Sequence, residues 1–228
     1  MPPESTCTTK PALAQERRAA VVQRQTRRCR WGVADEACGG HPGFLDGGAG
    51  RGLWSCAEVP HTTRVWEERP ATHIPPWRGR GRRPQRERLV AGAPEARPGL
   101  EVAAGLPTAA WTRQTSKAGS QGPMVAECAA LRVRAVRDAL PGPDVWVVWR
   151  RHRETGAWKT SLSHAPVDTV VEIHVRLSGM RWPIDTCCED GKQRLGMGDD
   201  AVRSWTGWHP HRTLVILAHF FGVRLSLR

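Results

Sequence analysis

The chain has 228 residues, of which 34 are Lys or Arg and 22 are Asp or Glu, and its formal net charge is +12. This length allows one large domain or two small ones. Hydrophobic residues make up 39% of the chain, which excludes the composition of a disordered tail. The positive charge favours a polyanionic partner such as nucleic acid, because each neutralised phosphate releases condensed counterions. The alternative is a basic protein that binds no polyanion.

No segment predicts export or membrane insertion. The N-terminus lacks the apolar core of a signal peptide. The longest apolar run, Leu214 to Val223, contains His219 and is shorter than the roughly 20 residues that span a bilayer. The seven cysteines form no Cys-x-x-Cys pair, which argues against a structural zinc site and fits a reducing compartment. We therefore expect a cytoplasmic protein with no membrane partner.

The N-terminal quarter predicts a helix followed by two strands. Residues 9–24 have helical periodicity, with Thr9 as a plausible cap. Residues 29–35 predict a short strand, and residues 52–59 predict a second, apolar strand. A helix followed by two strands is typical of an α/β sheet.

From Pro60 to about Pro107 the chain is rich in proline, and six arginines lie within residues 78–88. This composition predicts an extended segment on the surface. Its arginines indicate either a solvated basic loop or a contact with the DNA backbone.

The middle of the chain predicts β-structure, and the last part predicts helices. Apolar residues alternate with arginines from Leu131 to Ala135, and residues 144–150 and 157–163 flank a turn. After Pro166 the periodicity becomes helical. Three helices are expected there: from Asp168 or Thr169 to about Met180, from about Pro183 onward, and over about His211 to Arg224.

Charged residues are most dense at residues 178–195. Four of them fall close to one stripe of a helix: Arg181, Asp185, Glu189 and Lys192. A neighbouring apolar stripe could pack on a sheet. Such spacing is typical of a surface helix with salt bridges, and the same side chains could also form a reactive centre with carboxylates between two cations. The spacing alone leaves both interpretations open.

The stretch RWPIDTCCEDGKQRLGMGDDAVRSWTGWHPHRTLVILAHFF resembles the C-terminal signature of a group of DDE-class bacterial insertion-sequence transposases. In that signature Tyr, Arg, Glu and Lys are separated by two, three and six residues. VADEACGG, residues 33–40, resembles the family segment that carries the second catalytic acid. Further segments are also similar to the family: EVPHTTRVWEERPATHIPPW, GSQGPMVAE, ALPGPDVW and SHAPVDT. The resemblance covers nearly the whole chain.

The resemblance assigns roles to particular residues. Asp35 stands at the position of the second catalytic Asp, and Asp185 stands where the family has its catalytic Glu. Both would ligate metal ions, Mg²⁺ or Mn²⁺, which activate the attacking water or 3′-hydroxyl and stabilise the leaving oxygen of the phosphodiester. Arg181 and Lys192 stand at the Arg and Lys positions and would bind phosphates of transposon-end DNA.

The resemblance also implies a fold: an RNase H-like α/β core, a β-rich insertion and C-terminal helices. Residues 1–60 are then a partial core with the second acid, residues 61–165 the insertion, and residues 166–228 the helical part of the core. The family has its first catalytic Asp on a strand ahead of the helix at residues 9–24, and we find no such strand here. We therefore expect an incomplete core with some apolar surface left uncovered.

Further departures from the family pattern predict an inactive protein. Asp185 in place of Glu retracts the carboxylate by about 1.5 Å, whereas such sites need placement within roughly 0.5 Å. Glu189, one turn later, is an alternative acid. Ser178 stands at the Tyr position, and Cys38 and Cys188 stand where an aromatic residue is expected. Loss of buried aromatic side chains would lower stability.

His209 and His211 lie in a segment that also resembles the family. Paired histidines can bind a metal ion, but no Cys or acid lies at ligand spacing from them. Packing or a phosphate contact is therefore the preferred interpretation.

The sequence thus predicts a transposase-family protein for DNA transposition, truncated and inactive by itself, with transposon-end DNA as its partner and a nucleoid-associated place in a bacterial cytoplasm. A second hypothesis is a non-catalytic, basic DNA-binding remnant that pairs with itself or with a full-length transposase and inhibits it. A third is a pseudogene product that neither folds nor binds. DNA binding without metal-dependent nicking would separate the second hypothesis from an enzyme.

Overall fold

The computed structural model describes residues 7–24, 29–119, 122–153, 155–180, 182–199 and 204–226. The chain divides into two units. The larger unit comprises Thr8–Met180, and the smaller unit comprises Arg181–Arg228 with the first seven residues. The mixed α/β architecture with C-terminal helices that the sequence predicts is confirmed.

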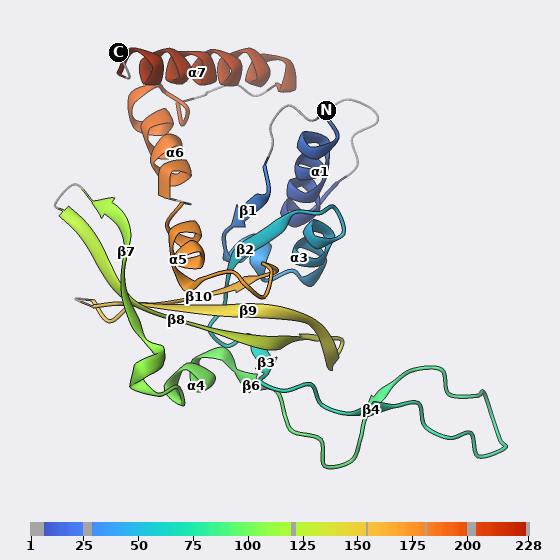
Figure 1. Ribbon diagram of the computed structural model, residues 1–228. Helices are drawn as coiled ribbons and strands as arrows, with labels where there is room; N and C mark the ends of the chain where they lie inside the picture. The colour runs from blue at the N-terminus through green and yellow to red at the C-terminus, as the bar shows by residue number, and fades with distance from the viewer. Residues whose placement is uncertain are drawn as a thin grey trace. The chain divides into compact units, whose positions relative to one another are not determined.

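The larger unit contains a mixed sheet of eight strands with the order β1-β2-β10-β9-β8-β3-β6, and β7 pairs with β8 (Figure 1). β1 and β2 are parallel, and the other described pairs of this sheet are antiparallel. The strands are β1 (Trp31–Ala34), β2 (Trp54–Val59), β3 (Arg64–Trp66), β6 (Arg97–Pro98), β7 (Thr112–Gly119), β8 (Gly122–Arg137), β9 (Leu140–His152) and β10 (Trp158–Ser163). A separate ladder joins β4 (Thr72–His73) to β5 (Arg88–Leu89).

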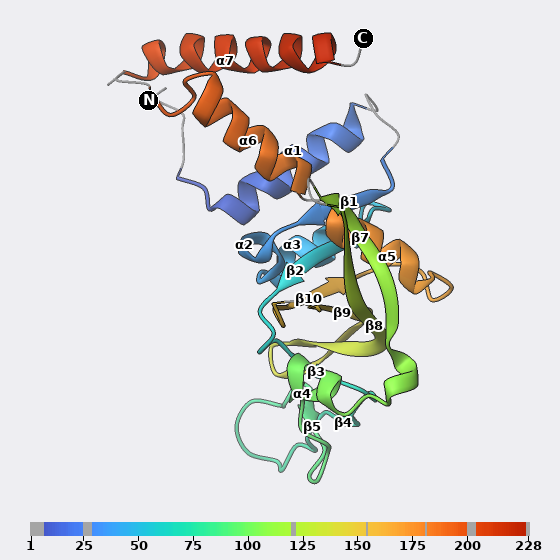
Figure 2. The ribbon, with the colours of Figure 1, turned by 90° about the vertical axis from the view of Figure 1, so that its left-hand side faces the viewer.

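Helices of the larger unit are α1 (Lys10–Gln23), α2 (Glu36–Gly39), α3 (Pro42–Ala49), α4 (Gly99–Ala104) and α5 (Val171–Gly179), with a 3-10 turn at Thr108–Ala110. The short helices α2 and α3 form the crossover between the parallel strands β1 and β2, and both contact β2. Figure 2 shows them beside β2, while α5 lies beside β7. The parallel pairing of β1 with β2 depends on this crossover, and the sequence patterns of the two strands alone do not predict it.

The predicted N-terminal helix is confirmed by α1. Thr9 is its N-cap, and the hydroxyl of Thr9 accepts a hydrogen bond from the Ala12 N–H at 3.4 Å. This bond satisfies one of the backbone donors that the first helical turn leaves without a partner. The predicted strand at residues 29–35 is shorter in the structure, because the chain leaves β1 after Ala34 and turns into α2.

Buried side chains of β8 and β9 form the centre of the core. Val133 and Ala135 of β8 are buried, whereas Arg132 and Arg134 between them are only partly buried, as the sequence pattern predicts. Trp149 of β9 is the largest fully buried side chain. It belongs to one apolar cluster that also receives Leu45 from α3 and other side chains from β2, β8, β10 and α4.

Two helices begin at other residues than the sequence predicts. α5 begins after Val170, which makes no side-chain cap, and not after Asp168 or Thr169. The last helix, α7 (Trp205–Ser226), begins earlier than His211, although it contains Pro210. Pro210 is the sixth residue of the helix and lies inside it, so it cannot supply the backbone N–H that an interior helical residue donates. α6 (Trp182–Arg194) agrees with the helix expected from Pro183.

In the smaller unit, α6 and α7 contact each other. α7 carries exposed apolar side chains, including Leu214, Ile216 and Phe221, and Val215 is buried. No helix of the described part of the chain is long and apolar enough to cross a membrane.

Candidate active site and basic arm

Asp35 directly follows β1 and is the N-cap of α2. Its carboxylate Oδ1 accepts a hydrogen bond from the Cys38 N–H at 3.2 Å, and its backbone carbonyl accepts one from the Gly39 N–H at 2.8 Å. In α/β sheets, ligand and catalytic groups gather at the carboxyl ends of parallel strands. The predicted acid therefore lies at a position of this kind, on the βαβ crossover, and is half-buried.

Arg18 of α1 lies beside this crossover. Its guanidinium donates a hydrogen bond to the Phe44 carbonyl at 2.6 Å and stands 4.3 Å from the centre of the Phe44 ring. Burial, followed by the charge of Arg51, lowers the pKa of Arg18. Burial, followed by the charge of Asp35, raises the pKa of the Cys38 thiol, so this thiol stays protonated beside the carboxylate. Cys38, expected at an aromatic position, packs instead as a half-buried side chain against the core.

The other predicted acid lies in the smaller unit. Asp185 is exposed in the first turn of α6, and Lys192 is exposed in its last turn. Along α6, Glu189 accepts a hydrogen bond from Gln193 at 3.0 Å, and Arg194 pairs with Asp190 at 3.3 Å. Arg181, predicted to bind DNA, lies outside the described residues.

The two predicted acids belong to different units, so neither unit by itself contains both of them. Within the described ranges, no three His, Cys, Asp or Glu side chains are placed so that they could hold a metal ion. Mg²⁺ prefers a near-octahedral set of oxygen ligands, and a helix-capping carboxylate provides only part of such a set. The described donors of either unit therefore do not fit a complete magnesium site.

A partly buried polar network near the crossover was not predicted. The Ser55 hydroxyl lies 3.1 Å from Nδ1 of His164, whose Nε2 lies 3.3 Å from Oδ1 of Asp46. Arg137 donates two hydrogen bonds of 2.9 Å to the Asp46 carboxylate, and these lower the pKa of that carboxyl. Although the order Ser–His–Asp resembles a hydrolytic triad, Ser55 is only 1% exposed and Asp46 is already paired with Arg137. The network therefore ties α3 to β2, β8 and the end of β10.

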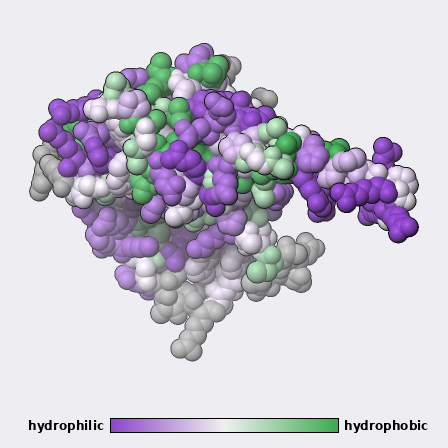
Figure 3. Space-filling view, turned by 90° about the horizontal axis from the view of Figure 1, so that it is seen from below, coloured by the Kyte–Doolittle hydropathy of each residue, from purple (hydrophilic) through white to green (hydrophobic). Residues whose placement is uncertain are grey.

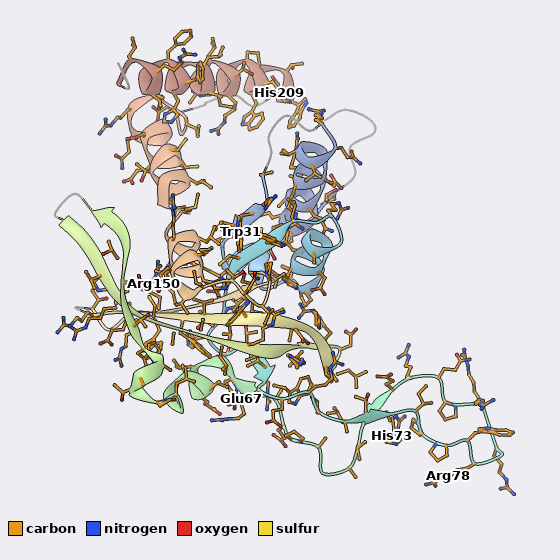
Figure 4. The ribbon with its side chains drawn as sticks, viewed as in Figure 1. Trp31, Glu67, His73, Arg78, Arg150 and His209 are labelled. Atoms are coloured by element: carbon orange, nitrogen blue, oxygen red, sulfur yellow. The ribbon has the colours of Figure 1, made fainter. Side chains whose placement is uncertain are left out.

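A long excursion leaves the sheet between β3 and β6, and we call residues 67–96 the arm (Figure 1). Its root is hydrogen-bonded: Trp66 Nε1–H donates to the Pro94 carbonyl at 2.9 Å, and Arg64 donates to the Ala96 carbonyl at 2.8 Å. Glu67 pairs with Arg97 at 2.9 Å. In Figure 4, Glu67 lies at the root of the arm, and His73 and Arg78 lie farther out along it.

The outer part of the arm is strongly basic and exposed. The arm forms a hydrophilic projection in Figure 3. The six arginines within residues 78–88 are all exposed: Arg78, Arg80, Arg82, Arg83, Arg86 and Arg88. The extended surface segment predicted from the prolines is confirmed over most of this range, but β3, β6 and the helix α4 within residues 60–107 were not predicted.

Replacing Gly39 by alanine should destabilise the crossover that carries Asp35. A Cβ at Gly39 would collide with the backbone carbonyl of Glu58 and would also crowd Ala57, because α2 packs directly on β2 at this point. Overpacking of this kind costs about 1–3 kcal/mol. Urea denaturation of the two proteins would measure the loss.

Gly43→Ala in α3 is the matched control. A Cβ at this position meets no atom within 4 Å, so the substitution is expected to be neutral or to stabilise the protein by up to about 1 kcal/mol. Equal effects of the two substitutions would contradict the close packing of α2 on β2.

Comparison with known families gives a match over residues 1–123 to the family described as DDE superfamily endonuclease. No curated protein matches the chain. The matched segment contains α1, Asp35, the βαβ crossover and the whole arm. Endonucleases of this family perform transposase-like cleavage of DNA and typically use a divalent metal ion. Because the match covers more than half of the 228 residues, the chain belongs to the DDE superfamily endonuclease family.

Proposed function

We propose that this chain is a protein of the bacterial insertion-sequence transposase family, that it binds transposon-end DNA, and that it does not cleave DNA by itself. The single observation that carries the proposal is the position of Asp35 at the carboxyl end of β1, on a βαβ crossover within the family-matched segment. DNA binding is supported by the net charge of +12 and by the exposed arginines of the arm.

Residues 1–60 are proposed as a partial RNase H-like core, residues 61–165 as a β-rich insertion, and residues 166–228 as the helical part of the core. β1 is an edge strand of the large sheet, with β2 as its one described partner. Asp35 and Asp185 are proposed as the positions of the family acids.

Lys192 and Arg181 are proposed as the cations that bind DNA phosphates. The exposure of Lys192 on α6 supports the proposal that this residue binds a DNA phosphate. The family cofactor is Mg²⁺ or Mn²⁺, and the donors described above do not complete a site for it. The lack of cleavage by this chain follows from that incomplete donor set.

The first experiment is a binding titration of the purified chain with a labelled duplex at several salt concentrations. For about four neutralised phosphates, the affinity should fall about 100-fold between about 50 mM and about 200 mM salt. No salt-sensitive binding would contradict DNA as the partner.

A nicking assay on supercoiled plasmid with Mg²⁺ or Mn²⁺ tests the proposal that the chain does not cleave DNA by itself. The control is Asp35→Asn, because asparagine caps a helix as well as aspartate but cannot supply the anionic oxygens. We expect the chain and this variant to give the same background. Metal-dependent nicking that Asp35→Asn abolishes would show an active endonuclease and contradict the proposal.

A second candidate function is inhibition of a full-length transposase by pairing with it. The exposed apolar side chains of α7 and the open edge of β1 favour it, since both are surfaces that another chain could cover. Adding the chain to an active transposase of the same element would then reduce transposition. Unchanged transposition at an excess of the chain would contradict this candidate.

A further inference from the structure

The tip of the arm has an alternating composition: residues 77–84 read Trp-Arg-Gly-Arg-Gly-Arg-Arg-Pro. Residues 78–88 contain six arginines and a single acid, Glu87. Among the described residues, none of the six guanidinium groups makes a hydrogen bond or an ion pair within the protein, and all six side chains are exposed. A solvated cluster of this density creates a strong positive potential at the end of a projecting segment.

The two glycines of the tip leave its backbone open. Gly79 has φ +81° and Gly81 has φ +74°, a conformation that other residues rarely adopt. A Cβ at either position would meet no protein atom within 4 Å, so internal packing does not require these glycines. What they permit is a close approach of the backbone to a partner, with arginine side chains on both sides.

Local bonds hold the tip in this form. Trp77 Nε1–H donates a hydrogen bond to the Gly81 carbonyl at 3.1 Å, which closes a short turn around the Arg-Gly-Arg sequence. Pro76 and Pro84 flank this turn and restrict the backbone on both sides. The hydrogen-bonded root of the arm fixes its other end to β3 and β6. Less conformational entropy is therefore lost when the tip binds.

The shape and charge of the tip fit the minor groove of duplex DNA. The major groove admits a helix or a two-stranded ribbon, and the tip has neither. The minor groove is only about 6 Å wide, so a segment without Cβ atoms at alternate positions reaches its floor most easily. In A·T tracts this groove narrows further, and its enhanced negative potential attracts inserted arginines.

We propose that residues 78–84 enter the minor groove of duplex DNA and bind A·T tracts more tightly than G·C tracts. This inference rests on the proposed function, and it adds the groove and the base preference by which the arm recognises DNA. Arg80 and Arg82, on either side of Gly81, insert into the groove, while Arg86 and Arg88 neutralise phosphates along its edge.

The test measures the affinity of the full chain for three short duplexes of equal length, with A·T, G·C or inosine·cytosine tracts. Inosine lacks the minor-groove amino group of guanine but keeps its major-groove atoms, so the third duplex reports which groove is read. We expect the A·T and inosine·cytosine duplexes to bind about tenfold more tightly than the G·C duplex, which corresponds to about 1.4 kcal/mol.

Two double variants separate the effect of the backbone shape of the tip on DNA binding from the effect of its positive charge. Gly79→Val with Gly81→Val keeps every charge, but it adds side chains at the two open positions and disfavours the positive-φ backbone of the tip. The A·T preference should therefore disappear while the salt dependence stays. Arg80→Ala with Arg82→Ala should lose both the preference and part of the salt dependence. Arg17→Gln in α1 with Arg24→Gln just after it removes the same charge from exposed positions, and the preference should remain.

The outcomes separate this inference from the proposed function. If the chain binds all three duplexes equally, or if the glycine variant keeps the preference, the minor-groove assignment is wrong and DNA binding stands. If the inosine·cytosine duplex binds like G·C, the preference comes from the major groove and the assignment is again wrong. If the chain binds no duplex at any salt concentration, both the inference and the proposed function fail.

Discussion

Replacement of Trp149 by alanine should remove much of the stability of the larger unit. Trp149 lies on β9, where it is paired in register with Ala129 of β8 and Thr160 of β10, and its side chain is completely buried. Large-to-small substitution of a buried tryptophan costs about 3–5 kcal/mol, because the cavity collapses only in part. Most domains are stable by only about 5–15 kcal/mol, so the variant should unfold at far lower urea concentration.

Trp149→Phe is the matched control for this experiment. The Nε1–H of Trp149 is buried and has no hydrogen-bond partner within the described part of the chain. Phenylalanine removes this unsatisfied donor while keeping most of the ring volume, so its cost should be about 1 kcal/mol. If alanine and phenylalanine lower the unfolding free energy equally, Trp149 is not at the centre of the core.

Acidification from pH 7 to pH 4 should destabilise the larger unit through His174. This side chain of α5 is fully buried, with its ring 6.4 Å from that of Trp31 and 5.4 Å from that of Trp146. Neither ring nitrogen has a hydrogen-bond partner in the described structure. Burial, together with the charge of Arg132, lowers the pKa of His174 from 6.5 to about 4.

The sign of the effect follows from this lowered pKa. Below pH 6.5 the unfolded chain binds a proton at His174 that the folded protein does not bind, so stability falls as the pH decreases toward 4. The full difference corresponds to about 3 kcal/mol, since one pKa unit is about 1.4 kcal/mol. Unfolding free energies from urea titrations at several pH values would measure this slope.

His174→Phe is the control, because it fills a similar volume and does not titrate. The decrease of the unfolding free energy between pH 6.5 and pH 4 should become much smaller in this variant. It should not vanish, because burial also lowers the pKa of His164. Asp46 acts at lower pH: its lowered pKa contributes stability that is lost only as the pH falls below about 3.8. An unchanged slope in His174→Phe would contradict the assignment.

Elements with a complete local signal could be predicted from the sequence. α1 has a capping threonine at its start, and β9 has a run of apolar residues that a glycine turn separates from β10. α3 was not predicted, because three of its eight residues are glycine, Gly43, Gly47 and Gly48, which is a turn composition. Burial of Phe44 and Leu45 stabilises this helix, and burial depends on residues that are distant in sequence.

The candidate site, like the fold, could be predicted from the sequence only in part. The catalytic role of Asp35 stays a prediction, which rests on the resemblance of its segment to a known motif. The network of Ser55, His164, Asp46 and Arg137 could not be predicted, because Asp46 and Arg137 are 91 positions apart and carry no shared pattern. Likewise, nothing in the spacing of Asp185 and Lys192 indicates that they belong to a unit separate from Asp35.

The pairing of β2 with β10 has a consequence for synthesis. Thr160 lies opposite Val59, and Ser163 lies opposite Cys56, so this part of the sheet forms only after more than a hundred further residues have been made. Contacts of such high sequence separation make folding slow, because loop-closure entropy is lost before the contacts form. During translation, β2 therefore has only β1 of its two partner strands until β10 leaves the ribosome, and chaperones have a long interval in which to bind its uncovered edge.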